Sequence, residues 1–262
     1  MVTTLDTPED IRLAARAGQY RGLTTGLAPG FVQANLFVVP GDWASEFEAF
    51  CAANPGACPL LAAGRPGDPH LPELGDFDLR TDLPAYWAYL DGQRTSELGE
   101  IGSIWRDDLV AFAVGCWFSM EEAIAADDIR QRHIELGIQG ALFITSHPAV
   151  PAGRLSGPLV VSMRPFAAGD VARVTEITGR FQRTHGGPIH VGDPVALGIA
   201  AIDEPDFGEV LVPLAGEVPM FWGCGLTGLV ALQRSGVPFF VTHAAGAMLV
   251  TDMRNTALQT GG

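Results

Sequence analysis

The sequence predicts an α/β fold in which helices flank a mixed sheet and a second, smaller α+β subdomain packs against it. Short apolar runs bounded by Gly and Pro, typical of strands, alternate along the chain with amphipathic stretches typical of helices. A strand at 157–161, a helix at 170–181 and a strand at 189–191 follow one another in the order of an α/β unit, although sequence alone does not fix parallel pairing. With 262 residues, 47% of them hydrophobic, the chain can bury a sizeable core.

Each element is expected from a local signal. Thr7 should cap a first helix, with Pro8 in its first position and acidic residues in its first turn. The apolar run at 31–39 predicts a strand that ends at Pro40, and Asp42 then caps a second helix. Further strands are expected at 109–114, 157–161, 189–191, 210–212, 218–222, 239–241 and 248–250, and further helices from Ser119, at 170–181 and at 226–233.

The stretch from residue 54 to residue 84 is rich in Pro, Gly and Asp and shows little periodic pattern. So long an irregular segment in a compact chain is usually disordered or functional. Its apolar insert Cys58-Pro59-Leu60-Leu61 favours an ordered loop packed on the core. We expect a larger α/β subdomain from residues 1–137 and 211–262, with residues 138–210 forming the smaller α+β subdomain inserted in it.

The net charge of −14 argues against a nucleic-acid partner, because binding phosphates requires a basic surface. The first ten residues carry neither a basic nor an apolar signal region, so no secretory signal is expected. No apolar run reaches the roughly 18 residues of a membrane span, and no membrane partner is expected. The cysteines show no zinc-ligand spacing, which favours free thiols in a reducing cytoplasm. A homodimer is the default expectation for the oligomeric state.

Cys116 lies at an expected strand end, between Gly115 and the start of a helix that Ser119 would cap. The exposed amides of a helix start lower the pKa of a nearby thiol and also bind carboxylates. Cys116 is therefore a candidate nucleophile, and Ser119 a candidate ligand of the substrate. The alternative is a small core residue beside an ordinary helix cap. Cys224, followed by Gly225 and another helix start, repeats the arrangement and is a second candidate.

Two histidines and an aspartate are concentrated among turn-forming residues in the segment His185-Gly186-Gly187-Pro188-Ile189-His190-Val191-Gly192-Asp193-Pro194. Histidine moves protons near neutral pH and glycine lets the backbone approach a ligand, so His185 and His190 are candidate acid/base catalysts and Asp193 a candidate substrate ligand. The segment lacks the helical spacing of zinc-binding histidines, which makes a divalent metal the weaker hypothesis. A structural turn with hydrogen-bonded histidines is the alternative.

Thr242 and His243 directly follow an expected strand, where α/β folds commonly place their ligand sites. A satisfied surface histidine is the alternative. Arg80 and Arg164 each stand beside turn residues, and arginine binds carboxylates through two parallel hydrogen bonds. For Arg80 a structural pair with Asp82 is the favoured interpretation.

Taken together, these segments resemble the YcsI-type hydro-lyase family, which includes D-glutamate cyclase. The matches run in order from about Asn35 to Asp252, nearly the whole chain. The chain departs from the usual family pattern beside the expected pocket, with Trp117 in place of a serine and Ala247 in place of a histidine. The matching segments are Asn54-Pro55, Cys58-Pro59-Leu60-Leu61, Arg80-Thr81-Asp82-Leu83-Pro84, Gly115-Cys116, Arg132-His133, Val160-Val161-Ser162-Met163-Arg164-Pro165, the segment from His185 to Pro194, Glu217-Val218-Pro219, Phe221-Trp222, Cys224-Gly225 and Thr242-His243-Ala244.

The resemblance implies an enzyme without a cofactor that catalyses an intramolecular condensation of an acidic amino acid, as when D-glutamate cyclises to 5-oxo-D-proline. The α-amine attacks the γ-carboxyl carbon and water leaves. Arg164 and the amides after Cys116 would anchor the α-carboxylate, while His185 or His190 would move the protons. Cys116 or Cys224 would be either a thioester nucleophile or structural. Elimination of water from a small hydroxy acid, hydrolysis of a lactam, and binding of a small amino acid without catalysis are the alternatives.

Overall fold

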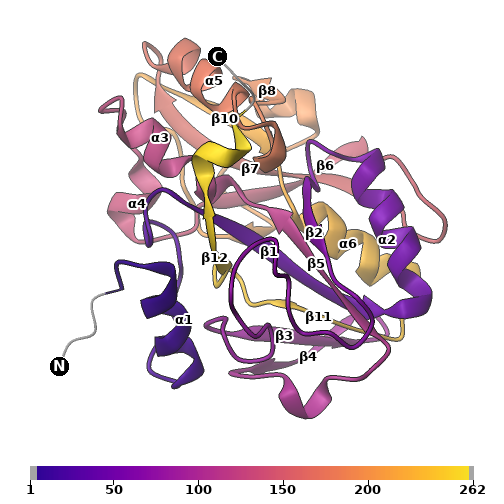
Figure 1. Ribbon diagram of the computed structural model, residues 1–262. Coiled ribbons are helices and arrows are strands. Elements are labelled where there is room, and N and C mark those ends of the chain that lie inside the picture. Colours follow the sequence, from indigo (N-terminus) through magenta and orange to yellow (C-terminus); the bar gives the residue numbers. More distant parts are fainter. Residues whose placement is uncertain (1–4, 260–262) are drawn as a thin grey trace.

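Two antiparallel sheets form the framework of the computed structural model, which describes residues 5–259 (Figure 1). Residues 1–4 lie outside the described residues. The expectation that the first ten residues form no secretory signal therefore falls partly on residues that the structure does not describe. The larger sheet has seven strands in the order β2-β5-β1-β11-β3-β4, and β12 pairs with the first half of β1. Its strands are β1 (Phe31–Pro40), β2 (Leu60–Ala63), β3 (Tyr86–Leu90), β4 (Gln93–Leu98), β5 (Leu109–Gly115), β11 (Phe239–His243) and β12 (Leu249–Arg254).

The smaller sheet has five strands in the order β8-β10-β7-β6-β9. Its strands are β6 (Ala141–Pro148), β7 (Pro158–Ala167), β8 (His190–Val191), β9 (Phe207–Gly208) and β10 (Glu217–Gly223). Because β7 and β8 both run antiparallel to β10, they share one direction, with β10 between them. The helix between β7 and β8 in the chain therefore makes the crossover connection that a strand-helix-strand unit requires.

The first helix begins at the predicted signal, whereas the predicted cap at Asp42 is wrong: the second helix starts one residue earlier, at Gly41, and Pro40 at its N-cap has no side-chain hydrogen bond to give. Thr7 forms a capping box with Asp10, in which each side chain accepts a hydrogen bond from the other residue's amide. No helix within residues 5–259 is long and apolar enough to cross a lipid bilayer. The α-helices are α1 (Pro8–Arg16), α2 (Gly41–Ala53), α3 (Glu121–Ala125), α4 (Arg132–Leu136), α5 (Val171–Gly179) and α6 (Leu226–Ser235), and the 3-10 turns are η1 (Gly102–Ile104), η2 (Trp117–Met120), η3 (Gln182–Thr184), η4 (Pro194–Leu197) and η5 (Asn255–Leu258).

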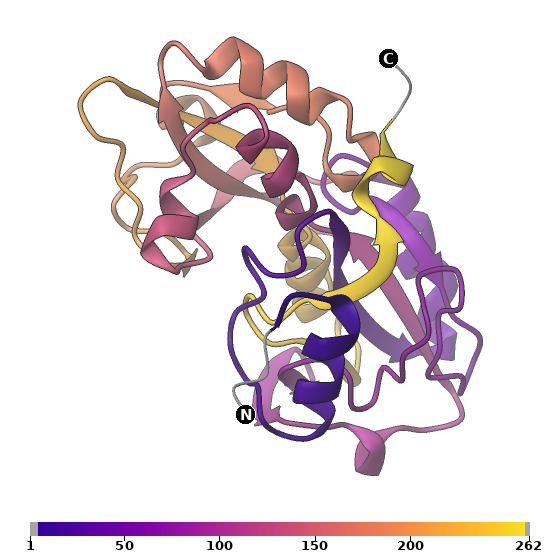
Figure 2. The ribbon, with the colours of Figure 1, turned by 60° about the vertical axis from the view of Figure 1, so that its left-hand side comes forward.

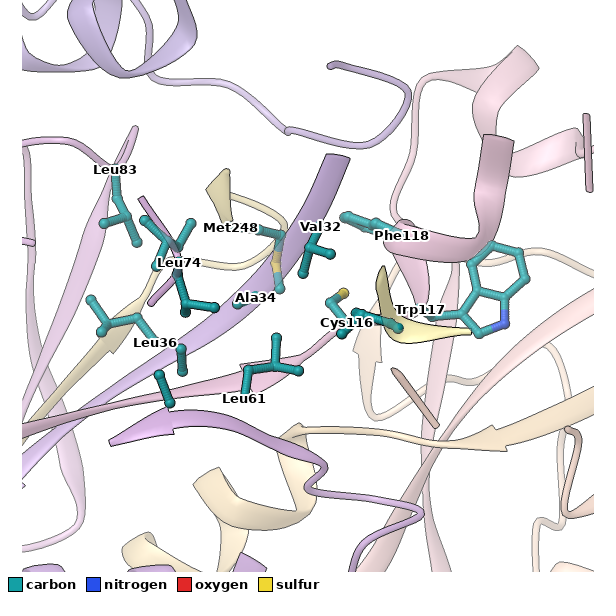
Figure 3. Close-up of a cluster of buried hydrophobic side chains, with 14 of the residues drawn as sticks. Val32, Ala34, Leu36, Leu61, Leu74, Leu83, Cys116, Trp117, Phe118 and Met248 are labelled. Atoms are coloured by element: carbon teal, nitrogen blue, oxygen red, sulfur yellow. The ribbon is translucent and has the colours of Figure 1, made fainter. Parts of the chain in front are cut away.

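A hydrophobic core joins the two sheets, which lie toward opposite ends of the molecule in Figure 2. Part of this core is drawn in Figure 3, where Val32 and Ala34 of β1 lie near Cys116. The same cluster contains Phe166 and Trp222 from the smaller sheet. A second cluster packs α2 and α6 against the other face of β1. Side chains from both sheets therefore meet in one region of the interior.

The predicted combination of helices and sheets is confirmed, but the sheets are not mixed, since all strand neighbours among the described residues are antiparallel. The strand predicted at 210–212 is wrong: these residues form a loop, and although Leu211 is buried no strand pairs with them. The predicted cap at Ser119 is also wrong. Ser119 lies in η2, and its hydroxyl bonds to the main-chain N–H and carbonyl of Gln33 at 2.9 and 3.1 Å. The division into two subdomains stays a prediction.

The segment at 54–84 is ordered, as predicted. It contributes β2 to the edge of the larger sheet, and its apolar side chains at Leu71, Leu74 and Leu83 are buried in the core. The hairpin of β3 and β4 was not predicted, although its turn carries a recognisable signal. Asp91 and Gly92 adopt φ of 48° and 77°, the left-handed pair for which an Asp-Gly hairpin turn is favoured.

Candidate active site

A cavity of about 140 Å³ lies where the two sheets meet. Its wall takes residues from β1, β3 and β11 of the larger sheet and from β6, β7 and β9 of the smaller one, and the turn η2 and the start of α6 complete it. Residues far apart in the sequence converge here. Six of the predicted site residues line this cavity: Cys116, Arg164, His185, Cys224, Thr242 and His243.

Arg164, on β7, places a buried guanidinium group in the cavity wall. It donates to the carbonyl oxygens of Met163, at 2.8 Å, and Gln139, whereas its Nε has no partner among the described residues. No carboxylate within residues 5–259 forms an ion pair with it, and burial lowers the pKa of Arg164. A charge removed from water without a counter-ion costs several kcal/mol. A ligand that supplies a carboxylate would offset that cost.

Two more buried polar groups of the wall lack a hydrogen-bond partner within the described part of the chain. Ser162 precedes Arg164 by two residues on β7, so both side chains lie on the same face of the strand, and Ser162 Oγ is unpaired. The indole N–H of Trp117 is also unpaired, and its ring lies 5.0 Å from the guanidinium carbon of Arg164. Buried polar groups normally have partners, so these donors indicate where ligand oxygens would bind. Ser162 was not among the predicted site residues.

Cys116 and Cys224 occupy equivalent turns, each between a strand end and a helical turn. Each sulfur accepts from a backbone N–H two residues further on, at Phe118 and Leu226. This arrangement was predicted, but the predicted lowering of the thiol pKa is wrong. Burial raises the pKa of Cys116 well above its usual value and that of Cys224 to about 12, because desolvation outweighs the amides. Both thiols are therefore protonated at neutral pH.

His185 reaches the cavity from a turn with φ of 91°, a conformation that residues other than glycine rarely adopt. Its Nδ1 lies 3.0 Å from the carbonyl oxygen of Gly56, so this nitrogen carries the proton. Burial lowers the pKa of His185 to about 4, although the carbonyls of Gly56 and Gly115 favour the charged ring. His185 is therefore a neutral imidazole at pH 7.

His243 is held between two acceptors. Its Nδ1 lies 2.7 Å from the carbonyl oxygen of Ala244, and its Nε2 lies 3.1 Å from Oδ1 of Asn35. The Asn35 amide is oriented by its own donation to the Gly115 carbonyl at 2.9 Å. Burial lowers the pKa of His243 to about 4, so the neutral ring has one proton for two acceptors. Asn35 was not predicted, and Thr242 beside His243 donates to the His243 carbonyl.

Arg80 lies outside the cavity. It forms an ion pair with Asp78 at 2.7 Å, two residues away. The pair expected with Asp82 is wrong, because the Asp82 carboxylate binds Arg16 at 2.6 Å instead. Both carboxylates belong to the ordered segment at 54–84, whose loop they help to fix.

The remaining three predicted residues also lie outside this cavity. His190 Nε2 lies 2.7 Å from the main-chain carbonyl of Asp193, and the Asp193 side chain accepts from the Val195 amide at the start of η4. Both residues thus stabilise a turn. Ser119 lines a separate cavity of about 180 Å³. Within residues 5–259 no group of three or more His, Cys, Asp or Glu side chains is placed to hold a metal ion, and the expected absence of a cofactor stays a prediction.

Comparison with known proteins places these residues in a family. A family model described as D-glutamate cyclase matches residues 110–252, a span that includes all six predicted residues of the cavity. A candidate hydro-lyase of Azorhizobium caulinodans is 46% identical and covers 98% of this chain and 95% of its own. A candidate hydro-lyase of Bordetella petrii is 49% identical over 94% of both chains. A solved nitrogen repressor-like protein from Methanococcus jannaschii, at 10% identity and a TM-score of 0.38, is too dissimilar to inform fold or function. The chain belongs to the D-glutamate cyclase family.

Proposed function

We propose that the chain is a hydro-lyase that anchors the carboxylate of a small acid at Arg164 and removes water from it by cyclisation, converting D-glutamate to 5-oxo-D-proline. The enzyme class follows from the family and from the relatives, which are candidate hydro-lyases. The cavity at the junction of the sheets would be the site of the reaction. The enzyme would act in the cytoplasm on free small molecules.

The buried guanidinium of Arg164 is the observation that supports this proposal most strongly. A substrate carboxylate would supply its missing counter-ion and accept from the unpaired Nε. Hydrogen bonds to charged groups contribute about 1.5–3 kcal/mol each, so two of them would stabilise the bound substrate by roughly 3–6 kcal/mol. The unpaired hydroxyl of Ser162 and the indole N–H of Trp117 would donate to further oxygens of the same ligand.

The volume of the cavity suits a small amino acid or its lactam. One water-sized group needs roughly 10–15 Å³ of such volume, so a cavity of about 140 Å³ holds on the order of ten of them. Glutamate has about ten non-hydrogen atoms. A substrate folded so that its amine meets its γ-carboxyl carbon would fill the cavity, and this proximity alone contributes up to about 7–11 kcal/mol in ideal cases.

In the proposed reaction the amine nitrogen attacks the γ-carboxyl carbon, a C–N bond forms, and a C–O bond breaks as water leaves. From the ammonium and carboxylate forms, two protons must move from the nitrogen to the departing oxygen: one gives the free amine and the protonated γ-carboxyl group, and the second moves as water leaves. His243 is one candidate carrier, because its protonated ring would satisfy both Ala244 and Asn35 while its neutral ring satisfies one. General acid–base catalysis of this kind contributes typically 10²–10⁴-fold. His185, whose charged ring is favoured by the carbonyls of Gly56 and Gly115, is the other candidate.

The protonated state of both thiols argues against a thioester intermediate, since the thiolate is the nucleophilic form. Cys116 and Cys224 would instead give the cavity two weak S–H donors and an apolar surface. Substitution of either residue by Ser is therefore expected to lower turnover without abolishing it.

The proposal is tested by incubating the enzyme with acidic amino acids and their lactams and measuring a mass change of one water by mass spectrometry. D-glutamate should lose water, and Arg164→Gln should reduce turnover at least a hundredfold, whereas the matched control Arg80→Gln, an arginine outside the cavity, should retain it. Equal turnover in Arg164→Gln and wild type would contradict the anchor. In deuterated water, cyclisation leaves the carbon-bound hydrogens in place; their exchange would instead indicate elimination from a hydroxy acid.

A further inference from the structure

The cavity wall holds one charged group at neutral pH. Among the described residues that line it, Arg164 is cationic, and no Asp or Glu takes part. The two histidines of the wall, His185 and His243, are neutral because burial lowers the pKa of each to about 4, and the two thiols are protonated. Two carboxylates act on Arg164 from outside the wall, those of Glu121 and Glu209.

Neither of these carboxylates lines the cavity. Glu121 accepts hydrogen bonds from the side chains of Thr25 and His133 at 2.8 and 2.9 Å and from the Gly26 amide at 2.9 Å, and it lines the second cavity. Glu209 accepts from a main-chain amide at 3.1 Å. A substrate ammonium group would therefore find no anion in the wall, and a second substrate carboxylate would find no second cation.

We propose that this cavity binds each ligand as a mono-anion, with one carboxylate held by Arg164 and every other ionisable group of the ligand in its uncharged form. The inference rests on the carboxylate anchor of the proposed function. The protonation state of the bound ligand depends on two free-energy costs. Protonating a second carboxyl group of pKa about 4.3 costs roughly 500-fold in affinity at pH 7, whereas burying an unpaired charge costs up to about 10³–10⁵-fold. The uncharged form is the less costly one.

For an amino dicarboxylic acid this selection has a chemical consequence. The species that the cavity favours carries a free amine and a protonated side-chain carboxyl group. It forms from the common zwitterion when one proton moves from the ammonium group to the side-chain carboxylate, without net exchange with solvent. The free amine is the nucleophile that cyclisation needs, and the protonated carboxyl group already carries the hydroxyl that departs as water. The wall thus disfavours any form of the substrate that leaves a charge unpaired, and so favours the reactive protonation state.

Calorimetry in two buffers of different ionisation enthalpy measures the protons exchanged on binding. At pH 7, butyrate should bind without exchange, glutarate should take up about one proton, and D-2-aminobutyrate should release about one. D-2-aminobutyrate should bind at least tenfold more weakly than butyrate. Because a histidine could also take up the proton, glutarate labelled with ¹³C in both carboxyl groups should show one carboxylate and one carboxylic acid signal when bound.

Binding of glutarate as a dianion, or of D-2-aminobutyrate without proton release, would overturn this inference while leaving the anchor intact. The Arg164→Gln variant separates the two proposals. If the acids bind this variant as tightly as wild type, the anchor itself is wrong, and both proposals fall. If binding is lost in Arg164→Gln and kept in Arg80→Gln, and the proton counts are as expected, both are supported.

Discussion

Replacing Arg164 by Met should abolish carboxylate binding and yet leave the folded state about as stable as before. Removing the guanidinium stabilises the folded state by several kcal/mol, because no charge then has to be desolvated. It also removes donations to the carbonyls of Met163 and Gln139, each worth about 1.5–3 kcal/mol. These contributions nearly cancel, so the free energy of unfolding should change by less than about 2 kcal/mol. The loss of about 3–6 kcal/mol of ligand binding corresponds to a fall of roughly 10²–10⁴-fold in affinity.

Urea unfolding and calorimetry with butyrate measure the two effects separately. Arg12→Met is a matched control, because Arg12 is equally buried but forms an ion pair with Asp252 at 2.7 Å and donates to Val250. Asp252 is 42% exposed, which screens the pair, so this control should lose about 1–3 kcal/mol of stability and keep its affinity for butyrate. If Arg164→Met loses more than about 3 kcal/mol of stability and still binds butyrate, Arg164 is structural and the reasoning is wrong.

The remaining predictions concern protons and single donors in the cavity. Burial lowers the pKa of His185 and His243 from 6.5 to about 4, so the unfolded chain binds more protons between these values, and stability should be full above pH 6.5 and fall toward pH 4. The slope should approach about 1.4 kcal/mol per pH unit for each histidine, and urea unfolding of the two His→Gln variants should show a shallower fall; an unchanged slope in both would contradict the assignment. Trp117→Phe should weaken butyrate binding about two- to tenfold in calorimetry, since the indole N–H would no longer be available to a ligand oxygen, and should also lower stability, because the buried ring packs against Trp222 and His133; equal affinity would reduce Trp117 to a packing role. Cys116 and Cys224 should react with iodoacetamide at pH 7.5 much more slowly than free cysteine, as followed by mass spectrometry, whereas rapid labelling of either would indicate a thiolate.

Local signals were sufficient to find the two cysteine turns but not to choose between neighbouring histidines. Cys116 and Cys224 each follow a glycine at the end of an apolar run, a pattern visible within a few residues. His185 and His190 share one turn-rich segment, and nothing in it separates them. The structure separates them because the His185 ring is buried against Gly56, which lies 129 positions away in the chain, whereas His190 bonds within its own turn. Such a contact depends on how the segments pack.

Asn35 and Ser162 illustrate what sequence reasoning missed. Each is a polar residue inside an apolar strand, and a buried polar group needs a partner or a ligand. That signal was present in the sequence. Its interpretation needed the strand order, because the pairing of β11 with β1 brings His243 to Asn35. The unpaired hydroxyl of Ser162 indicates a ligand site because Arg164 lies on the same face of β7. Pairing between distant strands was the missing information, and hydrophobic periodicity does not contain it.

The glycines beside the two cysteines explain how the main chains can approach closely at this junction. A Cβ atom at Gly115, the end of β5, would collide with a main-chain carbonyl of η3, directly before His185. A Cβ atom at Gly223, the end of β10, would collide with the carbonyl of Gly56 that holds the His185 ring. Both glycines thus let main chains from the two sheets approach closely. The two cysteine turns can therefore lie side by side in the cavity wall that also holds Arg164, and a larger residue at either glycine should disrupt this wall.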